Sequence, residues 1–220
     1  MDSRIIEELI TSFPKLLSVG IKVTIPLTLI SFTIGIGIAL MTAMVQTAKL
    51  PVLKQIARFY VWIIRGTPMI VQLFVVYFGL PSIGITLAAF PSAVIVFSLS
   101  VGAYCSETIR AAIESVPAGQ LEAGYCVGMN YWQTMVRIIL PQAFRTAFPP
   151  LSNSLIGLVK DTSLAYSVAI VEILATAQRI AARSYDYFWL YCEAGLIYLI
   201  FCTILTFVQS RMEKRMERKR

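Results

Sequence analysis

The chain has 220 residues, of which 57% are hydrophobic and 14% are charged, whereas ordinary soluble domains have about 25% charged residues. Its formal net charge is +7 and it contains no histidine. The composition excludes an ordinary soluble domain. The missing imidazole removes Ser–His and Cys–His nucleophile pairs and the commonest metal ligand, so neither a catalytic centre nor a metal site is predicted.

Long apolar runs dominate the sequence. Runs of about 20 residues match a hydrocarbon core of about 30 Å when they are coiled as helices, and the strict alternation of a membrane barrel is missing. Residues 1–13 do not resemble a cleavable signal, so the first run is expected to remain in the mature chain. We predict one all-α domain over residues 1–220, a polytopic membrane helix bundle with spans at 16–45, 59–80, 91–113, 151–173 and 187–209.

The distribution of lysine and arginine predicts the orientation of the bundle, because cytoplasmic loops carry an excess of both. One side holds twelve: Lys49, Lys54, Arg58, Arg110, Arg137, Arg145, Arg211, Lys214, Arg215, Arg218, Lys219 and Arg220. The other side holds four: Arg4, Lys15, Arg179 and Arg183. The C-terminus is therefore expected in the cytoplasm and the N-terminus outside. The basic tail follows a span directly, which favours an anchor on anionic lipid over a nucleic-acid site.

The polar loop at 117–142 separates the third and fourth spans. Residues 122–129 are predicted to form a short surface helix, on which Gly124 and Gly128, four apart, share a face that another surface can approach closely. Apolar residues that follow are expected to widen this docking face: Met129, Tyr131, Trp132 and Met135. The alternative is an amphipathic helix that rests on lipid headgroups.

Four charged residues lie within or near the inner thirds of predicted spans: Arg65, Glu107, Lys160 and Asp161. A charge near a helix centre costs at least ~2.5 kcal/mol, so these side chains are expected to face the bundle interior or water. Gly66 and Pro68 are predicted to interrupt the second helix, as in transporters whose broken helices line a cavity. The alternative is that the charges only pair with one another and hold the helices in register.

A site for a free α-amino acid needs a positive group, a negative group and neutral hydrogen-bonding groups, and this chain offers all three. Asn153 and Ser163 lie on the same predicted span as Lys160 and Asp161. Adjacent residues on a helix point about 100° apart, so one of these two charges is expected to bind substrate while the other pairs with Arg65 or Glu107.

The loop resembles the EAA loop of the membrane subunits of binding-protein-dependent ABC importers. Glu122-Ala123-Gly124, then Gly128, then Leu140-Pro141 match its pattern at every spacing, and only Gly124 departs from it by replacing the second Ala. The resemblance implies a cytoplasmic coupling helix that docks on a separate ATPase. It also implies an extracytoplasmic binding protein, a second permease copy or related chain, and a place in the bacterial cytoplasmic membrane.

The stretches 65–73, 107–113 and 149–164 are similar to permeases of the polar amino acid uptake branch. The stretch 149–164 and the loop before it most resemble cystine permeases, although the same stretches recur in permeases for glutamine, arginine, histidine and glutamate. This resemblance adds Thr67 and Gln72 to the expected substrate path. No G-x-x-x-x-G-K-[ST] phosphate loop occurs, so ATP and magnesium are assigned to the partner ATPase and no cofactor to this chain. An ion-coupled secondary transporter or channel is the main alternative, and a membrane scaffold is a second one.

Overall fold

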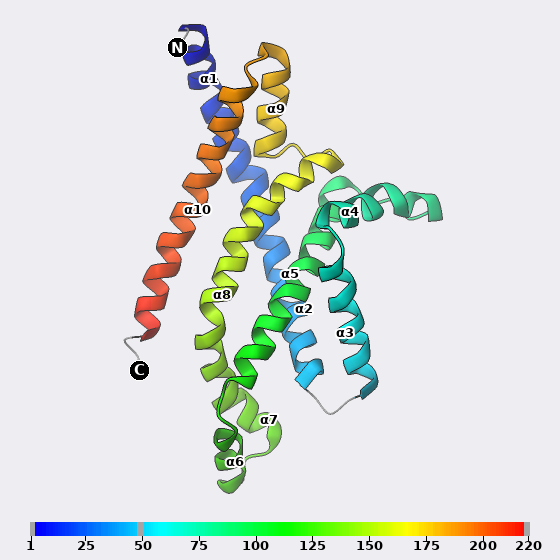
Figure 1. Ribbon diagram of the computed structural model, residues 1–220, viewed down its shortest axis with the longest axis vertical. Helices are drawn as coiled ribbons and strands as arrows, with labels where there is room; N and C mark the ends of the chain where they lie inside the picture. Colours follow the sequence, from blue (N-terminus) through cyan, green and yellow to red (C-terminus); the bar gives the residue numbers. More distant parts are fainter. Residues whose placement is uncertain (1–2, 48–50, 218–220) are drawn as a thin grey trace.

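The computed structural model describes residues 3–47 and 51–217, and every regular element within them is a helix (Figure 1). The predicted all-α fold is confirmed. The elements in chain order are α1 (Ser3–Val19), the π-helix η1 (Gly20–Thr24), α2 (Ile25–Thr47), α3 (Pro51–Gly66), α4 (Met69–Phe74), the π-helix η2 (Val75–Gly79), the 3₁₀-helix η3 (Leu80–Ile83), α5 (Ala89–Glu114), α6 (Ala118–Cys126), α7 (Tyr131–Thr134), the π-helix η4 (Met135–Ile139), α8 (Leu140–Asp161), the 3₁₀-helix η5 (Thr162–Val168), α9 (Ile173–Ser184) and α10 (Tyr187–Glu217).

Three helices are long and apolar enough to cross a membrane by themselves: Ser3–Thr47, Ala89–Glu114 and Tyr187–Met216. Two bent pairs bring the number to five if each pair is one span. The first helix begins at Ser3 instead of residue 16, because α1, η1 and α2 run on without a break. The ranges 91–113 and 187–209 lie inside unbroken helices, whereas 59–80 and 151–173 do not.

The second predicted span bends by 104° between α3 and α4. Proline lacks the amide hydrogen that a helix interior needs and forces the residue before it out of the helical region. Pro68 has an extended backbone (ψ 136°), and α4 starts directly after it. The predicted interruption is confirmed. The fourth span bends by 52° before α9, where Ala169 takes a left-handed conformation (φ +64°) at the end of η5.

The main core lies between α2, α5 and α8, with Phe97 and Val101 of α5 among its buried side chains. Helices α2 and α5 approach closely at Gly35, where an added Cβ atom would lie 2.5 Å from the Cβ of Val101. A second, smaller core joins α1, α9 and α10 through Leu16, Ile173, Ala177, Ala194 and Ile197. The fold thus has two packed groups of helices, and the chain passes from the first to the second between η5 and α9.

The start of α1 and the end of α10 point toward opposite ends of the bundle (Figure 1). The N-terminal part of α1 and α9 lie at one end, and α6, α7 and the C-terminal end of α10 point toward the other. Four of the basic residues used for the orientation lie outside the described residues: Lys49, Arg218, Lys219 and Arg220.

Candidate functional site

The loop between α5 and α8 folds as a compact helical hairpin. Helix α6 follows Pro117 and ends where Gly128 takes a left-handed conformation (φ +80°). The amide of Gly128 donates to the carbonyl of Tyr125 at 3.0 Å, and the amide of Met129 donates to the carbonyl of Gly124 at 3.0 Å. These two bonds make a Schellman cap, in which glycine avoids the strain that a side chain would bring.

The second half of the hairpin begins with a capping box at α7. The amide of Gln133 donates to Asn130 Oδ1 at 2.9 Å, and the amide of Asn130 donates to Gln133 Oε1 at 2.9 Å. The two halves meet at Gly124, where an added Cβ atom would lie 2.5 Å from Thr134 Cγ2. The loop is therefore held together largely by its own residues.

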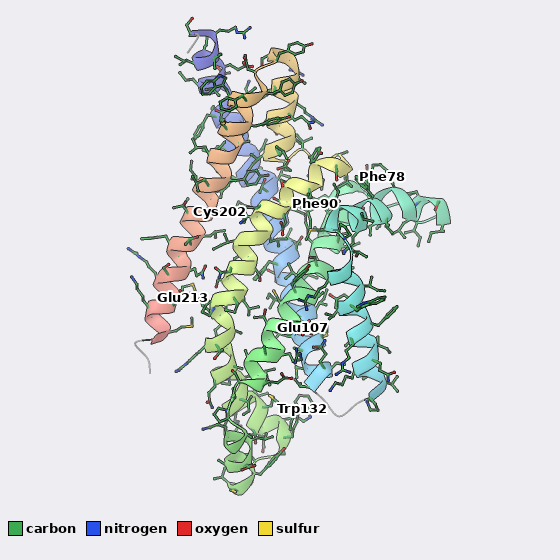
Figure 2. All side chains as sticks on the ribbon, in the orientation of Figure 1. Phe78, Phe90, Glu107, Trp132, Cys202 and Glu213 are labelled. Carbon is green, nitrogen blue, oxygen red and sulfur yellow. The ribbon has the colours of Figure 1, made fainter. Side chains whose placement is uncertain are left out.

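The prediction that Gly124 and Gly128 share one bare helical face is wrong. Helix α6 spans 118–126 and not 122–129, so Gly128 lies in the turn, while Gly124 is buried against Thr134. Met135, expected on the docking face, is only 7% exposed, whereas Trp132 is 58% exposed (Figure 2). The exposed residues of the hairpin include Glu122, Ala123, Tyr125, Val127 and Trp132.

Leu140 and Pro141, the last motif residues, begin α8. The backbone is helical without a break from Tyr131 through η4 into α8, so Pro141 lies inside a continuous helix, directly after the π-helical turn. Both residues line an apolar cavity of about 330 Å³ together with residues of α2, α5 and η4. The end of the hairpin is thus built into the main bundle.

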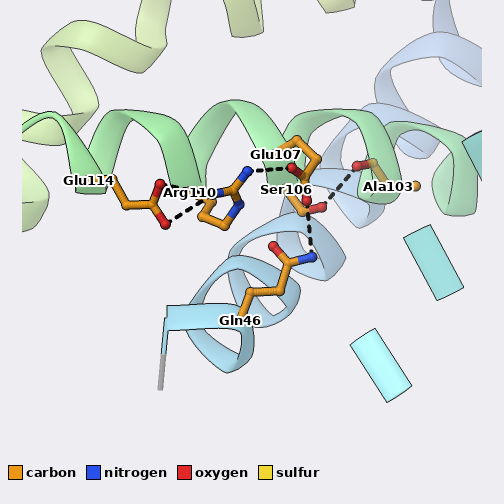
Figure 3. A network of polar contacts seen from close by, with 6 residues as sticks. All are labelled: Gln46, Ala103, Ser106, Glu107, Arg110 and Glu114. Atoms are coloured by element: carbon orange, nitrogen blue, oxygen red, sulfur yellow. Dashed lines mark hydrogen bonds and ion pairs between the residues drawn. The ribbon is translucent and has the colours of Figure 1, made fainter. Parts of the chain in front are cut away.

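Glu107 forms a polar network on α5 (Figure 3). Its carboxylate accepts hydrogen bonds from Gln46 Nε2 at 3.0 Å and from Arg110 Nη2 at 2.7 Å. Arg110 also pairs with Glu114 at 2.8 Å. Either Lys160 or Asp161 was expected to pair with Arg65 or Glu107. The structure corrects this for Glu107, since its partners come from α2 and from its own helix.

Arg65 lies at the end of α3 with its guanidinium carbon 5.2 Å from the ring centroid of Tyr104. It lines a polar cavity of about 370 Å³ between α2, α3 and α5, whose other charged residues are Lys54, Arg58, Glu107, Arg110 and Glu114. Arg65 and Glu107 therefore share one cavity, although no ion pair joins them in the described structure.

Thr67 and Gln72 hold the break between α3 and α4. Gln72 Nε2 donates to the carbonyl of Ile64 at 2.9 Å and to Thr67 Oγ1 at 2.9 Å. Thr67 Oγ1 donates to the carbonyl of Ile63 at 2.8 Å. Gln72 Oε1 is buried and accepts no hydrogen bond from the described residues. The break thus carries one free acceptor.

Lys160 and Asp161 end α8, and Ser163 lies on η5 directly after them. The side chain of Lys160 is exposed, and those of Asp161 and Ser163 are half-buried. No ion pair involves Lys160 or Asp161 within residues 3–47 and 51–217. Asn153, two turns earlier, instead binds α10, because Gln209 Nε2 donates to its Oδ1 at 3.1 Å.

The two broken helices meet, because α4 contacts η5. The predicted path residues therefore fall into three places. The first is the contact between the two broken helices, with Thr67 and Gln72 on one side and Lys160, Asp161 and Ser163 on the other. The second is the polar cavity, with Arg65 and Glu107, and the third is the contact of Asn153 with α10. Sequence reasoning missed Gln46 and Arg110, although the three-residue spacing of Glu107 and Arg110 on one helix is a signal for their pairing.

The structure is a membrane helix bundle with a polar helical hairpin between its third and fourth crossing segments and with two broken helices in contact. This is the architecture of an importer's membrane subunit. Residues 31–218 match the family described as "Binding-protein-dependent transport system inner membrane component". The chain belongs to this family. It is a multi-pass inner membrane permease, the non-catalytic membrane component of an ABC importer, and works with an ATPase and a binding protein. The ion-coupled alternative is thereby set aside.

Curated relatives and solved structures agree with this assignment. The chain is 51% identical over 208 residues to the L-cystine transport system permease protein TcyB of Bacillus subtilis (strain 168), covering 94% of this chain and 89% of the relative. It is 34% identical to the arginine transport system permease protein ArtQ of the same organism, covering 90% and 91%. A crystal structure of an amino acid ABC transporter with histidines matches with a TM-score of 0.86 at 30% identity, covering 94% and 96%. The MetNI methionine ABC transporter shares the fold, with a TM-score of 0.73 at 16% identity, covering 98% and 99%.

Proposed function

We propose that the chain imports a polar amino acid, and that this amino acid is cystine. The observation that carries the proposal is the 51% identity to a cystine permease over 94% of the chain. Relatives named for arginine and for glutamine reach 34% and 36% identity. The chain as a whole, residues 1–220, acts as one transmembrane domain of the importer.

The substrate path in this proposal runs past the two broken helices. A zwitterion is recognised by Lys160 or Asp161, with Ser163 as a neutral neighbour, and by Arg65 and Glu107 in the polar cavity. Asn153, which binds Gln209 of α10, lies further along the path. Support comes from the contact of α4 with η5 and from the free acceptor Gln72 Oε1, which can take a hydrogen bond from an ammonium group. Thr67 holds Gln72 in place.

The hairpin is the proposed coupling element. The exposed Glu122, Ala123 and Trp132 offer charge and apolar area to a partner cleft, while Gly124 and Gly128 give the hairpin its shape. Leu140 and Pro141 transmit a movement of the hairpin to α8. The docked ATPase binds ATP and magnesium, and its side of the membrane is the cytoplasm, together with the C-terminus.

A second copy of this chain, or a related chain, completes the importer in this proposal. The arm α4–η2–η3 projects from the bundle with Val75 and Phe78 exposed (Figure 2). Exposed apolar residues on a projecting arm are typical of surfaces that pack against a partner subunit or lipid.

The test is uptake of labelled cystine into vesicles that contain this chain, its ATPase and the binding protein, with and without ATP. Unlabelled glutamine, arginine and glutamate serve as competitors. ATP-dependent cystine uptake that these competitors leave unchanged supports the proposal. Uptake of another amino acid overturns the substrate, and uptake that follows an ion gradient and ignores ATP overturns the mechanism.

A further inference from the structure

A fully buried acidic residue lies at the passage from η5 to α9. Glu172 is 0% exposed, and its carboxylate has three hydrogen-bond donors. Its Oε1 accepts from the amide of Ala175 at 2.7 Å, and its Oε2 accepts from the amide of Leu174 at 2.9 Å. The hydroxyl of Tyr198 on α10 donates to the same Oε2. A buried carboxylate is costly unless such donors surround it.

The cap of a helix does not require the hydrogen bond from Tyr198. The two amide bonds make Glu172 the N-cap of α9. Short side chains such as Ser, Thr, Asp and Asn are preferred for that task. The longer glutamate also reaches a residue 26 positions further along the chain. Glu172 therefore both caps α9 and ties it to α10.

The tie lies where the two cores of the bundle meet. Val168 and Ile170, just before Glu172, belong to the main core, and Ile173, just after it, belongs to the core of α1, α9 and α10. Tyr198 packs against this second core. The bond between Glu172 and Tyr198 therefore anchors the chain to the second core directly after it leaves the main core.

The helices that this pair joins also pack against the proposed substrate path. Tyr198 lies on α10, which packs along α8, and α9, which Glu172 caps, contacts η5. Thr162 directly follows Lys160 and Asp161 and begins η5, which contacts α4. We infer that Glu172 and Tyr198 are positioning residues. They fix the start of η5, and with it Lys160 and Asp161, in the position that transport requires. This inference rests on the proposed path role of Lys160 and Asp161.

The chain offers a matched control for this pair. Glu193, also on α10, is buried and accepts a hydrogen bond from the hydroxyl of Ser12 on α1. This contact has the same chemistry and involves the same helix. It ties α10 to α1 rather than to the passage between η5 and α9.

The experiment compares uptake in vesicles that hold the full importer, at equal amounts of assembled complex, over a range of loaded binding protein. Y198F removes the donor, and E172D keeps a capping carboxylate that is too short to reach Tyr198. Both are expected to lower the maximal uptake per complex about tenfold, the loss typical of one hydrogen bond to a charged group. The double variant is expected to match the single ones, because the same bond is lost. S12A and E193Q are expected to stay within about twofold of wild type.

The outcomes separate the two proposals. If Y198F or E172D lowers only the amount of assembled complex and leaves uptake per complex unchanged, the pair has a merely structural role and the inference fails. A loss in S12A and E193Q equal to that in Y198F overturns it too. If K160A and D161A transport normally, the path proposal itself fails. If they are impaired while Y198F and E172D are not, only the positioning inference fails.

Discussion

The coupling hairpin and the proposed substrate path are built in opposite ways. The hairpin is held by residues close together in sequence, such as Asn130 with Gln133 and Gly124 with Thr134. The path depends on contacts between distant segments, since α4 meets η5 and Gln46 reaches Glu107 across 61 positions. A locally built element can keep its shape when the bundle around it moves. A path made from separate helices changes when any of them shifts, as alternating access requires.

The largest expected effect is that of reversing the charge at Glu122 on the exposed side of the hairpin. E122R is expected to lower ATP-dependent uptake about 100-fold, because a like charge at an interface costs several kcal/mol. The measurement is co-purification of the ATPase together with uptake. E7R, an exposed change in α1 at the opposite end of the bundle, is the control and is expected to keep the ATPase bound. Normal co-purification and uptake in E122R would remove the coupling role.

Substitutions in the path are expected to spare assembly and impair transport. K160A and D161A each lose a charged group at the end of α8, and uptake per complex is expected to fall about tenfold, the typical loss of a charge-assisted hydrogen bond. ATPase co-purification is expected to stay at the wild-type level. K214A, which removes an exposed lysine near the end of α10, is the matched control. Equal uptake in K160A and K214A would contradict the path assignment.

A methyl group at Gly124 is expected to have a smaller effect, because it strains the hairpin from inside. G124A would place a Cβ atom 2.5 Å from Thr134 Cγ2, and overpacking of this kind costs about 1–3 kcal/mol. ATPase co-purification is expected to fall several-fold. T134A removes the blocking atoms, so the double variant G124A/T134A is expected to regain most of the binding. A double variant no better than G124A would show that the contact with Thr134 is not the cause.

The smallest effect is expected when the capping box of α7 is removed. N130A removes the side-chain acceptor for the Gln133 amide and is expected to destabilise the hairpin by about 1 kcal/mol. Hydrogen exchange of the α7 amides measures this change. N130D keeps an acceptor at the same position and is expected to exchange like wild type. Faster exchange throughout α5 and α8 in N130A would show that the hairpin is not locally built.

Much of the fold could be predicted because a bilayer leaves few choices to an apolar run. The break at Pro68 could also be predicted, since the cause lies in proline itself. The shape of the hairpin could not, although its cap is local. The prediction extended the helix through Gly128, and the left-handed backbone at that residue ended it instead, so the shared glycine face does not exist.

The structure also gives a physical account of the one departure from the EAA pattern. Thr134 fills the space that a second alanine would need, so Gly124 is required by a residue ten positions further along. The partners of Glu107 and Glu172 escaped prediction for a related reason. Gln46 and Tyr198 lie on other helices, and only the packing of the bundle brings them within hydrogen-bonding distance.

The uninterrupted helix from Ser3 to Thr47 determines how far the protein extends along the membrane normal. At about 1.5 Å per residue its 45 residues extend about 67 Å, while a bilayer with its headgroups is about 40–45 Å thick. Even at a tilt of about 40°, near the upper limit for membrane helices, about 50 Å remain along the membrane normal. Part of this helix must therefore stand clear of the membrane. Where that part is the Arg4 end, which packs against α9 and α10, this end of the bundle extends beyond the lipid headgroups.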